Sequence, residues 1–313
     1  MFRWLVVGVG DITTKRVIPA ILSEPRSELV GIVTRNPSKA ENYRVASWSH
    51  LPSALENCEA DAVYIGTPVF LHAQQTIAAL KSGRNVLCEK PMALHYSEAA
   101  AMQQAASASG CTLGIAYYRR MYPKVERAKQ LIAAGAIGRP VFAEATSHDW
   151  FYPSDGFRSW LIDPKMAGGG PLRDIACHRI DLMNYLFGKP VRASGHLSTL
   201  IQPIQVEDNA TILIEYECGA RGMVDVRWHS RIARDEFRIR GTEGELNLTP
   251  LNGASLVYPG GSEDVPAHPN LHFPCMEEFV TAVLEGRSPR SSGENALATE
   301  WVMDEVANAP VRS

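Results

Sequence analysis

An aspartate and a histidine stand four residues apart in the stretch "GGGPLRDIACHRIDL", residues 168–182. At about 100° per residue, a helix through this stretch places Asp174 and His178 on one narrow stripe, together with Asp181 and Tyr185. A carboxylate at that spacing can orient the imidazole and stabilise its protonated form. The pair is therefore a candidate proton-transfer site in which His178 exchanges the proton.

A pair of polar residues four positions apart also has a plain structural explanation. Both side chains can lie on a solvated helix face and take part in no reaction. A zinc site would use Asp174, Cys177 and His178. Cys177 lies off the stripe and no second cluster offers the remaining ligands, so no metal is expected. Glycines directly before the helix let a ligand approach the backbone, which favours the proton-transfer interpretation.

A second candidate site lies near the N-terminus, in "LVVGVGDITTKRVIPAI". Gly8 and Gly10 end an apolar run and precede a helix start. In dinucleotide-binding loops the first glycine makes the tight turn, the second admits the pyrophosphate, and the helix N-terminus receives its charge. The position of the third glycine is taken by Thr13, so the motif is incomplete. Its place in the first strand-to-helix unit still predicts a nucleotide site.

The end of the next predicted strand bears on which nucleotide binds. NAD-binding loops carry an acid there, which holds the ribose 2′-hydroxyl. This chain has Thr34 and Arg35 instead. An arginine can stack on adenine or pair with a 2′-phosphate, and the missing carboxylate removes the repulsion against that phosphate. The sequence therefore predicts NADP in preference to NAD.

Polar residues also follow two further predicted strands. "VLCEKPMAL" places Glu89 and Lys90 before a proline, which restricts Lys90 to extended geometry. "YIGTPVFLH" places Thr67 and Pro68 after a strand and His72 one turn into the next helix. The carboxyl ends of parallel strands form the crevice in which open α/β sheets bind ligands. A solvated turn and a structural histidine are the plain alternatives.

Strand and helix patterns position these residues. From residue 1 to about 117, five strand patterns alternate with helical segments near 13–23, 38–46, 69–81 and 95–109, which predicts a doubly wound parallel sheet of the Rossmann type. After 118 come a helix near 123–134, an extended run over 139–150, an irregular stretch to 167 and the helix with His178. Hairpin-like runs over 190–258 predict an antiparallel sheet, followed by helices near 273–285 and 293–308. We expect a cofactor domain over 1–118 and an α/β domain for substrate binding and oligomerisation over 119–313.

Length and composition exclude several classes of protein. The 313 residues suffice for two domains, and no apolar run approaches the roughly 20 residues of a membrane span. The net charge of −3, without basic blocks, argues against nucleic acid as partner. Six scattered cysteines suggest neither a disulfide framework nor a zinc knuckle, so a reducing cytoplasmic location is expected. Small molecules are the expected partners.

The motifs "GVGDI", "GTPVFLH", "CEKPMAL", "AGGGPLRDIACHRIDL" and "GTEGEL" occur in this order. On these motifs taken together, the chain resembles the Gfo/Idh/MocA family of NAD(P)-dependent oxidoreductases over nearly its whole length. The resemblance implies a Rossmann domain followed by an α/β domain whose large, open, mostly antiparallel sheet mediates homodimer or homotetramer contacts.

The resemblance also implies roles for individual residues. Lys90 matches the family's catalytic lysine, and Asp174 and His178 match its acid and its proton-transferring histidine. The further residues expected at the cofactor are Gly8, Gly10, Asp11, Ile12, Thr34, Arg35, Thr67, Pro68, His72, Glu89, Lys90, Arg119 and Trp160; those expected at the substrate are Lys90, Tyr118, Trp160, Asp174 and His178.

Two positions depart from the family's pattern. Val69 replaces a frequent asparagine and Leu161 replaces a frequent arginine, both at what we expect to be the rim of the active site, so the substrate is expected to differ from the family's common sugars. The motifs and the resemblance together predict hydride transfer between a nicotinamide and a hydroxyl or carbonyl carbon of a sugar, polyol or cyclic diol. An NAD-dependent glycosidase of the same family and a non-catalytic NAD(P)-binding sensor are the alternatives.

Overall fold

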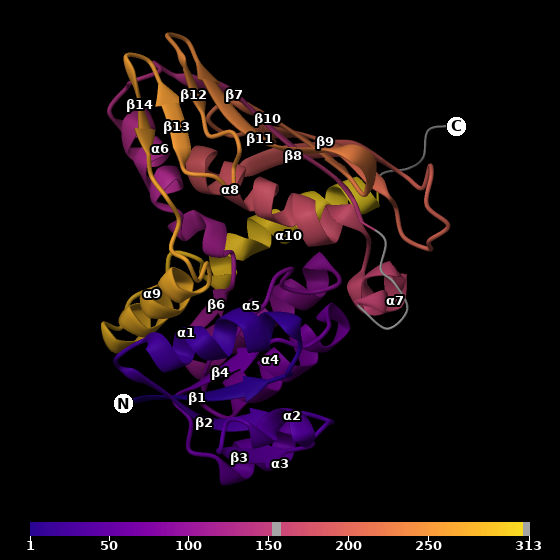
Figure 1. Ribbon diagram of the computed structural model, residues 1–313, viewed down its shortest axis with the longest axis vertical. Helices are drawn as coiled ribbons and strands as arrows, with labels where there is room; N and C mark the ends of the chain where they lie inside the picture. The colour runs from indigo at the N-terminus through magenta and orange to yellow at the C-terminus, as the bar shows by residue number, and fades with distance from the viewer. Residues whose placement is uncertain (152–157, 309–313) are drawn as a thin grey trace. The chain divides into compact units, whose positions relative to one another are not determined.

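A parallel sheet forms the centre of the first part of the chain (Figure 1). Within residues 1–151 and 158–308, which the computed structural model describes, it has six strands in the order β3-β2-β1-β4-β5-β6. The strands are β1 (Phe2–Val7), β2 (Ser27–Val33), β3 (Ala46–Trp48), β4 (Ala62–Ile65), β5 (Asn85–Cys88) and β6 (Leu113–Ile115). All pairings in this sheet are parallel, and the strand order reverses between β1 and β4. The predicted doubly wound sheet is confirmed.

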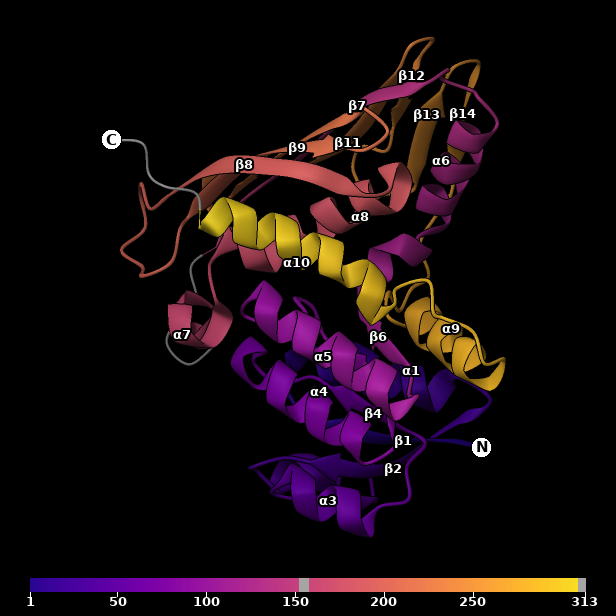
Figure 2. The ribbon, with the colours of Figure 1, turned by 180° about the vertical axis from the view of Figure 1, so that it is seen from behind.

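Helices cover both faces of this sheet, which explains why β1 is apolar from Trp4 to Val7: residues 4–7 are at most 1% exposed. Figure 2 shows α4 and α5 side by side on one face. The helical segments are η1 (Thr13–Val17), α1 (Ile18–Ser23), α2 (Ser38–Glu41), α3 (Leu51–Asn57), η2 (Val69–Leu71), α4 (His72–Lys81), α5 (Tyr96–Ser109) and α9 (Phe273–Leu284).

The local predictions miss some detail. The helix predicted over 38–46 is only the single turn α2, and β3 follows it; β3 and α3 were not predicted. The strand β3 has three residues, none of them buried, so it lacks the alternating pattern that reveals a strand. The segment η1 is a π-helical turn, a wider turn than the α-helix that the sequence pattern suggests.

The chain divides into two units, Met1–Tyr118 with His268–Leu297 and Arg119–Ala267 with Ala298–Ser313. The predicted domains, 1–118 and 119–313, stay predictions; in the structure the segment 268–297 belongs to the first unit. The reason is packing: the Phe279 ring lies 5.6 Å from that of Trp4, and a Cβ on Gly114 would stand 2.8 Å from it. Helix α9 thus extends the core of the parallel sheet.

The second unit is built on another sheet (Figure 1). Its order, for the described part of the chain, is β14-β13-β12-β11-β7-β10-β9-β8. The strands are β7 (Pro140–Trp150), β8 (Pro190–Ser198), β9 (Asn209–Tyr216), β10 (Arg221–Arg227), β11 (His229–Gly241), β12 (Glu245–Asn247), β13 (Ser255–Tyr258) and β14 (Gly261–Asp264). Among the described strands of this second sheet, only the pairing of β7 with β10 is parallel. The mostly antiparallel sheet is therefore confirmed.

Helix α8 packs against β7 and β10 on one face of this sheet. Burial alternates along β9: Ile212 and Ile214 are buried, whereas Leu213 between them is 52% exposed. One face of the sheet thus packs against the helices of this unit. The helical segments are η3 (Tyr118–Met121), α6 (Pro123–Ala133), η4 (Ser159–Ile162), α7 (Pro164–Ala167), η5 (Leu172–Ala176), α8 (Cys177–Phe187) and α10 (Gly293–Ala307), of which residues 298–307 belong to this unit.

No helix in the described residues has the length and apolar character needed to cross a bilayer. The predicted cytoplasmic location stays a prediction. The predicted irregular stretch before residue 167 includes 152–157, and the second predicted domain ends with 309–313; both segments lie outside the described residues.

The packing of α9 gives a direct test. Replacing the buried Phe279 by alanine removes the ring that contacts Trp4 and the backbone of β6. We expect Phe279→Ala to lower the free energy of unfolding by about 3–5 kcal/mol, measured by urea denaturation. Leu284→Ala on the same helix, at a side chain that is 59% exposed, is the matched control. Equal effects of the two changes would contradict the assignment of α9 to the first core.

Candidate functional site

The glycine loop after β1 has the geometry of a nucleotide-binding turn. Gly8 has φ +91°, and a Cβ there would lie 2.8 Å from the carbonyl oxygen of Gly66. Thr13 takes the place of the missing third glycine: its hydroxyl accepts the N–H of Gly10 at 2.7 Å, and its methyl packs on Gly66. A Cβ on Gly10 would meet no described atom within 4 Å. Thr13 and Gly66 thus pack against one side of the loop, and the position of Gly10 is unobstructed. In dinucleotide-binding loops this second glycine lets the diphosphate come close to the backbone.

Of the neighbouring predicted residues, Asp11 and Arg35 are exposed, Ile12 is partly exposed and Thr34 is buried. The carboxylate of Asp11 pairs with Lys15 at 2.6 Å, and Ile12 directly precedes the π-helical turn. At the end of β2, the Thr34 hydroxyl accepts the N–H of Asn36, so it stabilises the turn that presents the exposed Arg35. These four positions line the same carboxyl edge of the sheet as the glycine loop.

Lys39 is a residue that the sequence patterns did not reveal. Its ammonium donates to the carbonyl oxygen of Val9, between the two loop glycines, at 3.1 Å. A positive charge therefore stands beside the nucleotide loop in addition to Arg35. The segment "TRNPSKA" contains it four residues after Arg35, but a lysine on a predicted surface helix gives no signal that it folds back onto the glycine loop.

His72 links two of the crevice loops. It is 1% exposed, and its ring nitrogens face the carbonyl oxygens of Thr67 at 2.8 Å and Pro91 at 2.9 Å. Burial lowers the pKa of His72, although both carbonyls favour the charged ring. A polar contact of His72 with a cofactor would require one of these contacts to break. Thr67 and Pro68 remain at the strand end, where the Thr67 hydroxyl donates to Gln75 at 2.7 Å.

Glu89 lies beneath Lys90 in a buried hydrogen-bond network. One carboxylate oxygen accepts from the Tyr64 hydroxyl at 2.6 Å and contacts His272 Nε2 at 3.1 Å; the other accepts the main-chain N–H of Lys90 at 3.1 Å. Burial alone would raise the pKa of Glu89, yet these partners and the charge of Lys90 lower it to about 2. The carboxylate therefore fixes the backbone of Lys90, and its expected contact with the cofactor stays a prediction.

His272 was also not predicted, because it lies 183 residues beyond Glu89 and no motif surrounds it. Its ring stacks against that of Tyr118 with centroids 4.6 Å apart. Tyr118 is 7% exposed and ends the first unit, whereas Arg119 begins the second and donates to Asn252 at 3.2 Å. Their predicted places at the substrate and the cofactor are not tested by these contacts.

The helix with the aspartate and histidine begins with a π-helical turn, η5, which continues into α8. Asp174 lies in η5 and forms an ion pair with Arg158 at 3.6 Å. His178 lies in the first turn of α8 and is 4% exposed. Both residues therefore lie on one continuous helical segment, as predicted, and their roles stay predictions.

The rest of the predicted stripe has a structural role. Asp181, 1% exposed, forms a two-pronged ion pair with Arg120 at 2.8 and 2.5 Å, and the Tyr185 hydroxyl donates to Glu126 at 2.6 Å. Arg179, on the same helix, donates to Asp235 at 3.0 Å. Asp181 and Tyr185 are thus attachments to η3 and α6, and the interpretation of the stripe as a solvated face is wrong for Asp181.

The two departures from the family pattern are both buried. Val69 and Leu161 are each 3% exposed. Leu161 belongs to an apolar cluster with Ala167, Val206 and Trp228, and Trp160 packs against that cluster. The expected place of Val69 and Leu161 at the rim of the active site stays a prediction. Within the described residues, no group of three or more histidine, cysteine or carboxylate side chains is placed to hold a metal ion.

The strand order, the open glycine loop and the lysine at the end of β5 define a dinucleotide-binding Rossmann protein. Residues 2–117 match the model of the oxidoreductase family with an NAD-binding Rossmann fold, and residues 125–247 match that of the GFO/IDH/MocA C-terminal domain. The chain belongs to the Gfo/Idh/MocA family of oxidoreductases.

Relatives and solved structures agree with this family. The chain is 27% identical to 1,5-anhydro-D-fructose reductase of Ensifer adhaerens, over 95% of this chain and 92% of that protein. It is 31% identical to dTDP-3,4-didehydro-2,6-dideoxy-alpha-D-glucose 3-reductase of Streptomyces violaceoruber, over 97% and 94%. A levoglucosan dehydrogenase in complex with NADH and levoglucosan superposes with a TM-score of 0.87 at 25% identity, over 98% and 96%. The predicted enzyme class, an NAD(P)-dependent oxidoreductase acting on CH–OH groups, is confirmed.

The Glu89 network predicts a pH dependence. A carboxyl whose pKa falls from 4.5 unfolded to about 2 folded stabilises the fold above pH 4.5, by about 3 kcal/mol, and loses this contribution as the pH falls toward 2. We expect Glu89→Gln to be destabilised at pH 7 and to approach the wild type below pH 3, measured by urea denaturation across pH. Glu285→Gln, at an exposed ion pair, is the control. A difference that does not change with pH would contradict the ionised state of Glu89.

Proposed function

We propose that this chain is an NADP-preferring dehydrogenase or reductase that moves a hydride between a nicotinamide and a hydroxyl or carbonyl carbon of a sugar, polyol or cyclic diol. The observation that carries the proposal is the position of Lys90. It stands at the carboxyl end of β5 on a backbone held by Glu89, at the same sheet edge as the open glycine loop.

The residues present fit a dinucleotide. Gly8 and Gly10 would receive the diphosphate, because a Cβ at Gly10 would meet no described atom within 4 Å. Thr67 and Pro68 would flank the nicotinamide half from the loop after β4. When bound, the nicotinamide supplies the hydride chemistry.

The chain's own residues handle the substrate oxygen in this proposal. The Lys90 ammonium polarises that oxygen, and His178 accepts its proton during oxidation or returns it during reduction. Asp174 favours the protonated state of His178 through its charge. Trp160 would shape the apolar side of the substrate site, since it packs on the cluster around Trp228.

Lys90→Ala and His178→Ala should each lower kcat/KM by about 10²- to 10⁴-fold, because each removes a group that acts on the reacting oxygen. The measurement is NADPH absorbance with 1,5-anhydro-D-fructose, D-xylose, levoglucosan and scyllo-inositol, compounds in the names of the relatives. Lys81→Ala and His50→Ala, at exposed positions, are the matched controls. NADPH affinity should stay unchanged; its loss in either active-site variant would contradict the assigned roles.

The same panel separates the alternatives. A glycosidase of the family would release sugar from an aryl glycoside without net change in NADPH absorbance. A sensor would bind NADPH and turn over nothing.

The preference for NADP is supported by the two positive charges at the adenosine end of the loop. The double variant Arg35→Gln/Lys39→Gln removes both charges. It should weaken NADPH binding at least about tenfold, which corresponds to the loss of one charge-assisted hydrogen bond. NADH binding should stay nearly unchanged. Fluorescence titration measures both. Lys81→Gln is the control, and an equal loss for the two cofactors would contradict recognition of the 2′-phosphate.

We also propose that the chain forms a homodimer or homotetramer through the outer face of the second sheet. Leu213 is 52% exposed on the face of β9 opposite the buried Ile212 and Ile214, and Val191 on β8 and Ile232 on β11 are 48% and 72% exposed. An antiparallel sheet that packs one face on its own helices leaves the other face to water or to a second subunit.

A further inference from the structure

The helical segment that carries Asp174 and His178 begins at Leu172, directly after three glycines and a proline. The first N–H groups of any helix lack partners within it and need an outside acceptor when buried. Here the N–H groups of Arg173 and Asp174 bond the carbonyl oxygen of Gly170, at 3.1 and 3.0 Å. The remaining donor, the N–H of Leu172, bonds Oε1 of Glu207 at 3.0 Å.

Glu207 comes from the loop between β8 and β9, residues 199–208, 35 positions away in sequence. The glycines accommodate its approach. A Cβ on Gly170 would stand 2.1 Å from the main-chain oxygen of Glu207, and one on Gly169 would stand 3.3 Å from its carboxylate. The expectation that these glycines admit a ligand is therefore wrong for Gly170, whose open side is filled by Glu207.

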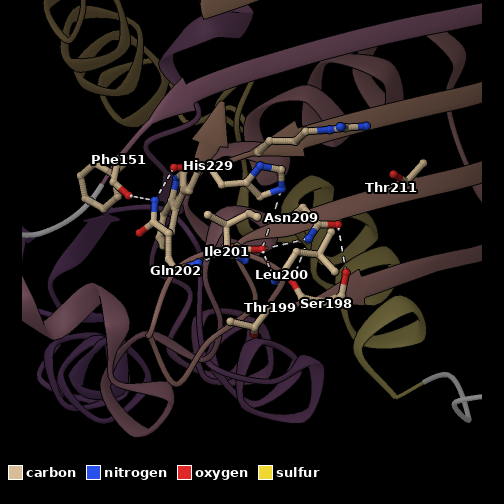
Figure 3. Close-up of polar contacts among 12 residues, drawn as sticks. Phe151, Ser198, Thr199, Leu200, Ile201, Gln202, Asn209, Thr211 and His229 are labelled. Carbon is tan, nitrogen blue, oxygen red and sulfur yellow. Dashed lines mark hydrogen bonds and ion pairs between the residues drawn. The ribbon is translucent and has the colours of Figure 1, made fainter. Parts of the chain in front are cut away.

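The loop itself is anchored by the next residue, Asp208, whose side chain is fully buried. Its carboxylate accepts the N–H groups of Leu200, Ile201 and Gln202 at 2.8 to 2.9 Å. Figure 3 shows these three residues converging, with Asn209 beside them; the amide of Asn209 adds a fourth bond at 2.9 Å. Because Asp208 is held by four donors, Glu207 has little freedom to leave the helix start.

We propose that Glu207 is the positioning residue for the proton-transfer pair: its carboxyl oxygen fixes the start of the helix and, through it, the place of Asp174 and His178. The inference rests on the proposed role of His178. Leu172 and His178 lie on one helical segment, so a shift at the first is passed to the second. Displacements of about 1 Å cost catalysis as much as about 10²-fold.

Acceptance of the N–H matters more than charge in this arrangement. Burial raises the pKa of the Glu207 carboxyl, although hydrogen bonds from the main chain at Gly170 and Leu172 oppose the rise. The charge of Arg173 opposes the rise as well. A glutamine at this position would keep an acceptor oxygen for the N–H of Leu172 without the charge.

Two neutral variants of similar volume separate the acceptor from the side chain's bulk. Glu207→Gln keeps an oxygen for the N–H of Leu172, and Glu207→Met does not. Glu217→Met, at an exposed glutamate of the following turn, is the matched control. Hydrogen exchange of a peptide covering 170–178 reports the helix start without reference to activity. The fastest substrate of the panel gives kcat, and fluorescence titration gives the Kd for NADPH.

We expect Glu207→Met to speed exchange in residues 170–178 and to lower kcat by about tenfold to a hundredfold, with an unchanged Kd for NADPH. Glu207→Gln and Glu217→Met should resemble the wild type. If the methionine variant does not fold, Glu207→Asp, which withdraws the carboxylate by one methylene, should show the same two effects.

Unchanged exchange, an unchanged kcat, or a glutamine variant as impaired as the methionine variant would each overturn the inference. A wild-type enzyme inactive on the whole panel would overturn the proposed function instead.

Discussion

Parallel pairing of β1 with both β2 and β4 is the constraint on which the candidate site depends. It brings the carboxyl ends of β1, β4 and β5 to one edge of the sheet. Each of these strands continues into a loop whose conformation the hydrogen bonds of the sheet do not fix. The contacts that hold these loops are specific. Gly8 and Gly66 approach each other because neither has a side chain, Thr13 occupies the space beside them, and His72 links the loops after β4 and β5.

Buried carboxylates perform a similar task in both units. Glu89 holds the backbone of Lys90, Asp181 attaches the histidine helix to Arg120, and Asp208 gathers the loop that presents Glu207. A buried carboxylate without partners is costly, so each of these groups requires its donors to stay in place. The candidate site residues thus stand on backbone that several hydrogen bonds hold in place.

The glycines illustrate how one residue type serves opposite purposes. Gly10 leaves space where a diphosphate would approach, whereas Gly170 has its space filled by the main chain of Glu207. Both glycines precede a helix start that opens with a π-helical turn, η1 or η5. The composition of the two loops does not distinguish these roles, because the difference lies in which distant segment packs there.

The sequence by itself determined the alternation of strands and helices in the first unit, the glycine loop, and the candidate residues Lys90, Asp174 and His178. These features are local: an apolar period, a turn residue and a spacing of four on a helix are properties of neighbouring residues. Only the tertiary structure decided that α9 joins the first unit and that Asp181 is bound to Arg120. It also decided that His272 contacts Glu89, that Lys39 contacts the glycine loop, and that Glu207 accepts the N–H of Leu172. Each of these findings depends on a contact between segments that are far apart in the sequence. Such contacts leave no periodic pattern or fixed residue spacing, so a single sequence does not reveal them.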